Sequence, residues 1–293
     1  MFYLKVGLTI ALIAYLIHSI GWANILRTLS NADLNLFLLS CCLIPIFVLL
    51  KAWKWHTMVR FAGATENFSR SLHAILAGLG FGIFTPVRAG ELYRVKYYES
   101  LEKTSLASLV ILDRVIDLIA IVFLGIYFVI DQFGLFSSFY VLLIGAFMVL
   151  VVGNLSKIRN LTLRMENSGR VSDFIRKATA CFNILSVKNV SLLLGMSLIN
   201  WVFITVQFYI IMNMYQTLKF KVALASLPII QLTNLLPVTI AGVGVRESLS
   251  ILVMDIYKVP NQVAAIGAFS LYMVDVLIPG TVGLILFCSE KNG

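Results

Sequence analysis

Long apolar runs separated by short polar stretches make up most of this chain. A helix needs about 20 apolar residues to cross a bilayer, and six of the runs approach or exceed that length. The pattern therefore predicts an all-α polytopic membrane protein, with residues 1–293 forming a single integral membrane domain. The predicted transmembrane helices cover residues 2–20, 34–53, 105–130, 137–153, 189–214 and 261–288.

Two further apolar runs, 71–97 and 222–257, are interrupted by proline and glycine. The first contains "TPVRAGELYR" and the second contains "LPVTIAGVGVRES", so each passes through proline and glycine to arginine and glutamate. We expect each run to form two half-helices around the break, as a re-entrant hairpin that leaves the membrane on the side it entered. Two such segments in corresponding places favour an inverted repeat with a central binding site.

Composition and charge support this interpretation. The chain is 60% hydrophobic and 13% charged, whereas a soluble chain carries roughly 25% charged residues. With the N-terminus inside and the two hairpins oppositely oriented, 15 Lys and Arg residues lie inside and 4 lie outside. Because cytoplasmic loops are enriched in these residues, the count predicts cytoplasmic N- and C-termini in the cell (inner) membrane. The loop 154–188 is the most basic segment and is predicted to be cytoplasmic.

Neither nucleic acid nor a cofactor is predicted as a partner. The net charge of +9 is explained by the loop residues, and the sequence has no helix-turn-helix or RNA-binding pattern. The cysteines and histidines lack the spacing of metal ligands or of a disulfide framework.

Charged residues inside the two interrupted runs are the candidate binding groups. An isolated charge at the bilayer centre costs roughly 2.5–3.5 kcal/mol on insertion scales, and irregular backbone at depth is tolerated only inside protein or beside a wet cavity. Arginine holds phosphate with a planar fork, and a helix that starts after Gly244 offers backbone N–H groups to an anion. We therefore predict a polar cavity for a phosphate-bearing lipid head group, lined by Arg88, Glu91, Arg94, Arg246 and Glu247.

A second charged group lies in "LDRVID", within the predicted helix 105–130. Asp113 and Asp117 are four residues apart and share one helical face, with Arg114 between them. Two interpretations stay open: a salt bridge that braces the helices, or a gate or proton-linked element. Asp275 is a lone acid in the last predicted helix, and we expect an arginine from one of the hairpins to pair with it.

The three motifs "TPVRAGELYR", "LDRVID" and "LPVTIAGVGVRES" resemble, in this order, the flippase-like transmembrane domain of lysylphosphatidylglycerol synthases. The stand-alone relatives are dolichol-phosphate-sugar synthetase-like membrane proteins. The resemblance covers most of the chain and implies two re-entrant segments and lipid translocation. Carried over by position, it marks Pro86, Gly90, Glu91, Arg94, Arg114, Asp117, Pro237, Gly242, Gly244, Arg246 and Glu247.

The chain departs from the family in two respects. It contains no soluble aminoacyl-transferase segment, so lysyl transfer to lipid is not expected. Many members carry an arginine near the stretch Tyr272–Asp275, and this chain has none there. The charge balance of its site therefore differs.

The function that these observations favour is translocation of a phospholipid or a polyprenyl-phosphate-linked sugar, without enzymatic activity. One alternative is a membrane-embedded transferase that acts on a lipid phosphate, for which Asp113 and Asp117 are the candidate acids. Another alternative is an accessory subunit of a lipid or polysaccharide assembly system. The predicted partner is an anionic phospholipid or a lipid-linked sugar, and an oligomer is compatible with the sequence.

Overall fold

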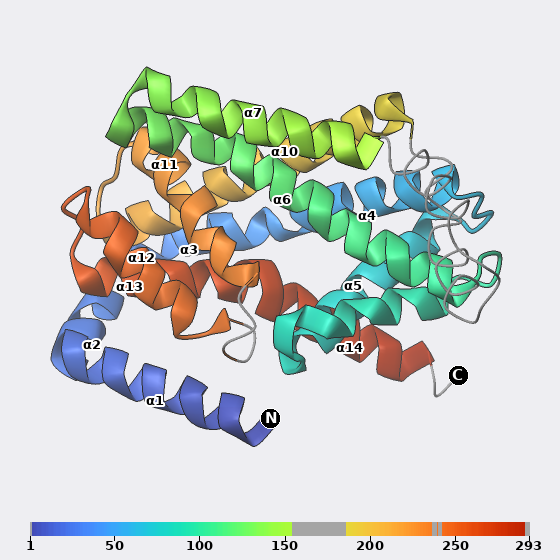
Figure 1. Ribbon diagram of the computed structural model, residues 1–293. Coiled ribbons are helices and arrows are strands. Elements are labelled where there is room, and N and C mark those ends of the chain that lie inside the picture. The colour runs from blue at the N-terminus through green and yellow to red at the C-terminus, as the bar shows by residue number, and fades with distance from the viewer. Residues whose placement is uncertain (1, 154–185, 236–238, 240–241, 291–293) are drawn as a thin grey trace. The chain divides into compact units, whose positions relative to one another are not determined.

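The computed structural model describes residues 2–153, 186–235, 239 and 242–290, and every regular element in them is helical (Figure 1). Most of the basic loop 154–188 lies outside these residues. The elements are α1 (Phe2–Ile20), α2 (Trp22–Ser30), α3 (Leu34–Cys42), α4 (Ile44–Phe61), α5 (Phe68–Phe84), a 3₁₀ segment (Pro86–Tyr97), α6 (Lys103–Phe133), α7 (Leu135–Gly153), α10 (Val187–Tyr215), α11 (Phe220–Gln231), a 3₁₀ turn (Leu232–Leu235), α12 (Val245–Asp255), α13 (Asn261–Tyr272), a π-helical turn (Met273–Leu277) and α14 (Ile278–Glu290).

Several helices are long and apolar enough to cross a membrane. Three continuous ones qualify within the described residues: Leu34–Phe61, Lys188–Tyr215 and Asn261–Ser289. A fourth is obtained if α1 and α2, which meet at an angle of 80°, count as one broken span. The chain is therefore a helical membrane protein, and the arrangement of six spans with two re-entrant hairpins stays a prediction.

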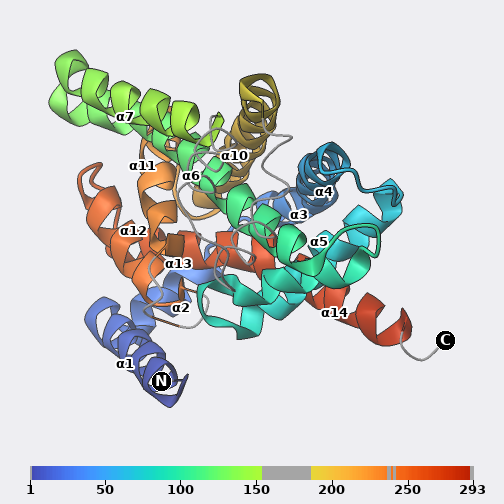
Figure 2. The same cartoon turned by 45° about the vertical axis from the view of Figure 1, so that its right-hand side comes forward.

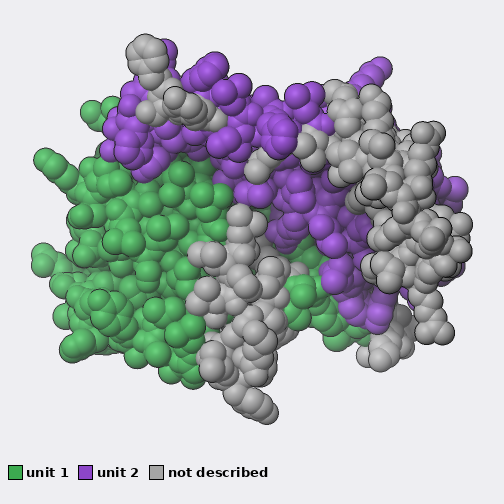
Figure 3. All heavy atoms as spheres, viewed as in Figure 1, with its two compact units in different colours: residues 1–48, 76–91, 201–293 green, residues 49–75, 92–200 purple. Residues whose placement is uncertain are grey.

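The chain divides into two compact units, shown in different colours in Figure 3. Unit 1 comprises residues 1–48, 76–91 and 201–293, and unit 2 comprises residues 49–75 and 92–200. In unit 2, α6 and α7 lie side by side in both ribbon views (Figures 1 and 2). One face of α6 supplies much of the core of unit 2, including the buried Leu106, Leu109 and Ile116.

In unit 1, α12 packs against both α11 and α13, and α13 continues through the π-helical turn into α14 (Figure 2).

Glycine allows α14 to lie close to α5. A Cβ on Gly80 would come within 2.7 Å of the carbonyl oxygen of Gly280, and a Cβ on Gly283 would overlap the backbone of Leu76. Small residues at such contacts let two membrane helices approach each other closely.

The bend between α1 and α2 is set by two residues. Gly21 has φ 85°, a conformation that residues with a side chain rarely adopt. Asn24 donates a side-chain hydrogen bond of 2.8 Å to the carbonyl of Ile20, which α1 leaves without a helical partner at its end. Glycine and asparagine together therefore end one helix and start the next at a sharp angle.

Candidate functional site

The first predicted break lies where it was expected, directly after α5. Thr85 satisfies the backbone there, because its hydroxyl donates to the carbonyl of Phe81 at 3.1 Å and accepts from the N–H of Gly90 at 2.7 Å. Pro86 then starts a 12-residue 3₁₀ segment, whereas the second α-helical half of a re-entrant hairpin was expected here. This segment carries Arg88, Glu91 and Arg94.

Gly90 is explained by packing within this turn. A Cβ at this position would overlap the backbone of Phe81 and Gly82 on α5. The 3₁₀ segment thus folds back against the helix that precedes it, and only glycine permits the approach. The family resemblance marks Gly90 as a site residue, and in the structure Gly90 lets the 3₁₀ segment approach α5.

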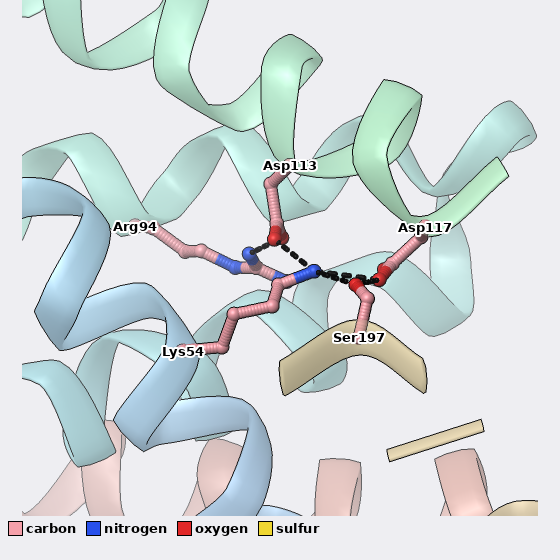
Figure 4. Close-up of polar contacts among 5 residues, drawn as sticks. All are labelled: Lys54, Arg94, Asp113, Asp117 and Ser197. Carbon is pink, nitrogen blue, oxygen red and sulfur yellow. Dashed lines mark hydrogen bonds and ion pairs between the residues drawn. The ribbon is translucent and has the colours of Figure 1, made fainter. Parts of the chain in front are cut away.

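Unit 2 contains a buried ionic cluster, defined here as Lys54, Arg94, Asp113, Asp117 and Ser197 (Figure 4). Lys54 on α4 is at its centre. Its ammonium lies 2.6 Å from Asp113 Oδ1, 2.5 Å from Asp117 Oδ1 and 2.9 Å from Ser197 Oγ. Ser197, on α10, also donates to Asp117 at 2.5 Å. One side chain of α4 therefore joins α6 to α10.

Arg94 connects the 3₁₀ segment to the same cluster. Its Nη1 lies 3.0 Å from Asp113 Oδ2, whereas Lys54 contacts the other oxygen of that carboxylate. Its guanidinium carbon lies 5.3 Å from the centre of the Trp55 ring, a distance suited to a cation–π contact. Arg94 is only 1% exposed, so its contacts come from protein and not from water.

The cluster balances its formal charges. It contains two cations and two carboxylates, and each of the four residues is less than one tenth exposed. Buried ions require partners and hydrogen bonds to offset the lost solvation. Asp113 and Asp117 share one face of α6, as predicted from their spacing, and the cation between them is Lys54. Arg114, which lies between them in sequence, is half-buried.

Sequence reasoning missed Lys54 because it was counted among the cytoplasmic loop residues. The predicted helix ended at residue 53, whereas α4 continues to Phe61. The segment "LKAWKWH" contains the relevant signal, since Lys54 stands between two tryptophans in a helix-compatible run. The candidate cations chosen from the sequence were all arginines, whereas Lys54 is also buried.

The second predicted break also lies where expected, at Gly242-Val-Gly244 in unit 1. Gly242 and Gly244 have φ 76° and φ 88°, and α12 begins at Val245. The N–H of Gly244 donates to Glu247 Oε2 at 2.6 Å, so Glu247 caps its own helix. This backbone donor, predicted to be available to an anion, is already engaged. Pro237 lies outside the described residues.

Arg246 and Glu247 are both buried at the start of α12. Arg246 Nε lies 3.6 Å from Glu247 Oε1, and the guanidinium stacks over the ring of Tyr272 at 4.4 Å. Tyr272 ends α13 and precedes the π-helical turn that carries the buried Asp275. In this turn the N–H of Ile278 bonds to the carbonyl of Met273, one residue further back than in an α-helix.

The predicted site residues thus fall into two described groups. Arg94, Asp113 and Asp117 meet in unit 2, and Gly242, Gly244, Arg246 and Glu247 meet in unit 1. Glu91 is buried in unit 1, and Pro86 and Arg88 belong to the 3₁₀ segment. That one cavity is lined by residues of both groups stays a prediction.

Apolar spanning helices with buried, paired charges define a polytopic helical membrane protein. Residues 2–283 match the family model described as lysylphosphatidylglycerol synthase TM region, and the chain belongs to this family. It is also similar to UPF0104 membrane protein MJ1595 of Methanocaldococcus jannaschii, with 25% identity over 316 residues, 97% of this chain and 92% of that protein. The family expected from the three motifs is therefore confirmed.

Proposed function

We propose that this protein moves a phosphate-bearing lipid, either a phospholipid or a polyprenyl-phosphate-linked sugar, across the cell membrane. The observation that carries the proposal is the buried ionic cluster, whose four charged residues are less than one tenth exposed in a helical membrane protein. Ionisable residues inside a membrane are rare, are costly to insert and tend to mark pathways for substrates or ions. Membership of a family named for a lipid synthase agrees with a lipid substrate.

The proposed topology follows from the same considerations. It has six transmembrane helices and two oppositely oriented re-entrant hairpins, with both termini in the cytoplasm and the chain in the cell (inner) membrane. The breaks at Thr85-Pro86 and Gly242–Gly244 support the hairpins, because α5 ends directly before the first and α12 begins directly after the second, as expected. Discontinuous helices of this kind surround the central sites of many transporters.

In the proposed mechanism the arginines of the two hairpins hold the phosphate while access alternates between the two membrane faces. Arg246 is suited to this task because Tyr272 and Glu247 fix its guanidinium, and a positioned fork loses less freedom when it binds an oxyanion. Arg88 would contribute from the first hairpin, with Glu91 balancing its charge. Movement of one half against the other would then expose the site to each side in turn.

The alternative of a membrane transferase finds less support. A transferase would need an acid available as a general base or as a metal ligand. Asp113 and Asp117 were its candidates, and both are held at 2.6 Å or less by the ammonium of Lys54. We therefore propose that the protein is not an enzyme.

The test is lipid translocation in vesicles that contain the purified chain alone. Fluorescent phospholipid and polyprenyl-phosphate-sugar analogues would be placed in one leaflet, and their transfer would be followed by chemical quenching from outside. We expect translocation above the rate in protein-free vesicles. Arg246→Lys should impair it because the fork is lost, while Arg27→Lys, at an exposed position on α2, should not.

Two outcomes would contradict the proposal. If the folded parent protein moved neither lipid, an accessory role would be favoured. If Arg246→Lys moved lipid at the parent rate, the assigned role of Arg246 would be wrong.

A further inference from the structure

Unit 1 contains a cavity of ≈ 630 Å³ in the bend between α1 and α2, which we call the elbow pocket. Its volume lies within the range of about 300–1,000 Å³ that is typical of small-molecule sites. α1, α2 and α13 supply most of its wall, with contributions from the start of α3 and the end of α10. The residues Val243, Gly244 and Glu247 at the second break also line it.

The shape of the elbow pocket depends on local chain chemistry. Ile13, Leu16, Ile17 and Ile20 recur at the spacing that places residues on one helical face, and all four line the pocket. Beyond Gly21 the chain turns by 80°, so that α2 closes the cavity from a second direction. A straight helix would carry the same residues without enclosing a space.

The few polar groups in the wall already bond to one another. The hydroxyls of Tyr215 and Ser270 share a hydrogen bond of 2.7 Å. Glu247 accepts from the N–H of Gly244 through one oxygen, and its other oxygen faces Arg246 Nε at 3.6 Å. The wall therefore presents mainly hydrocarbon, and a charged head group would lose its hydration there without gaining partners.

We propose that the elbow pocket holds one acyl chain of a bilayer phospholipid. The occupant follows from the wall and from the surroundings, because phospholipid chains are the abundant hydrocarbon around a membrane protein. The rim of the pocket is suited to their entry, since Trp22 and Leu34 are 59% and 67% exposed. The site recognises hydrocarbon and not a head group, and it binds lipid whether or not that lipid is transported.

Photo-crosslinking of the purified full chain tests the proposal. The probe is a phosphatidylglycerol with a diazirine on one acyl chain, added in detergent at increasing ratios, and the modified residues are mapped by mass spectrometry. We expect saturable labelling on residues 13–37 and 265–273. Unlabelled phosphatidylglycerol and phosphatidylcholine should compete equally, because the head group is not recognised.

Variants that fill the pocket provide the matched comparison. Ala265→Leu and Ile17→Phe add bulk to the wall, and Ile17 lies on its partly exposed rim, where the fold tolerates a larger side chain. Each should lower the labelling about tenfold, equivalent to roughly 1.4 kcal/mol. Leu252→Phe, at an exposed position on α12 outside the pocket, should leave it unchanged.

Three results would overturn the proposal. The label could spread evenly over the exposed helices, or the variants with a filled pocket could be labelled as strongly as the parent. Competition could also depend on the head group of the unlabelled lipid. The assay measures binding alone, so any of these results would leave the proposed transport function standing.

Discussion

Lys54→Met is the sharpest test of the buried ionic cluster. Methionine keeps an unbranched apolar side chain but removes the ammonium that Asp113 and Asp117 share. Asp113 keeps its contact with Arg94 at 3.0 Å. Asp117 keeps the hydroxyl of Ser197 but loses the ammonium at 2.5 Å. The substitution should therefore leave one buried carboxylate poorly compensated.

The expected loss of unfolding free energy is about 3–5 kcal/mol, the usual effect of removing one partner from a buried ion pair. A second substitution separates charge from packing. The double variant Lys54→Met with Asp117→Asn removes one positive and one negative charge, so the buried charges balance again. It should be more stable than the sum of the two single losses predicts, by roughly 0.5–3 kcal/mol of coupling.

The assay is reversible unfolding of the purified protein in detergent, followed by circular dichroism. Lys188→Met, at an exposed position on α10, is the control and should change stability by less than about 0.5 kcal/mol. If Lys54→Met were as stable as the parent, or if the two losses added without coupling, Lys54 would not be the buried counter-ion described here.

Three further predictions address other parts of the chain. Gly283→Leu should destabilise the protein by about 1–3 kcal/mol because the α5–α14 contact has no room for a side chain, whereas Gly195→Leu, with open space around it, should not. Burial raises the pKa of Glu66, but hydrogen bonds from Ser100 outweigh it and lower the pKa to about 2. The stability from Glu66 should therefore be present above about pH 4.5 and lost as the pH falls through 2, so melting curves of Glu66→Gln and the parent should converge only in strong acid. Cysteines placed in the loop 154–188 should resist labelling by impermeant reagents outside intact cells, and ready labelling would reverse the proposed topology.

The two breaks could be predicted because they depend on local chemistry. Proline removes a backbone donor, and glycine reaches positive φ at little cost, so "TPVRAG" and "AGVGVRE" mark their own interruptions. The shared face of Asp113 and Asp117 was predictable for the same reason, since the spacing of four residues determines it once the segment is helical.

The partner of those carboxylates was not predictable in this way. Lys54 precedes Asp117 by 63 residues, and nothing local distinguishes it from Lys51, one helical turn earlier. Its helix continues past the point where the apolar run stops, because α4 packs its polar end inside unit 2. Hydrophobicity alone therefore placed a buried cation in a loop.

Gly90 is a second residue whose contacts could not be predicted from the sequence. The sequence indicates that something approaches this residue closely, but it does not say whether that is a ligand or the chain itself. In the structure it is the backbone of α5. Gly90→Ala would therefore disturb folding, and a loss of transport in that variant would say little about lipid binding.

The two breaks have a common property that makes the functional tests interpretable. At the first, the hydroxyl of Thr85 bonds to both Phe81 and Gly90, and at the second the carboxylate of Glu247 caps Gly244. In the described residues, each interruption thus has backbone groups that bond to a side chain of its own segment. Arg246 takes no part in these backbone bonds, and lysine retains its positive charge. Arg246→Lys should therefore keep the fold while losing the planar fork. If this variant has unchanged stability and a lower transport rate, the loss indicates weaker binding of the lipid head group and not damage to the start of α12.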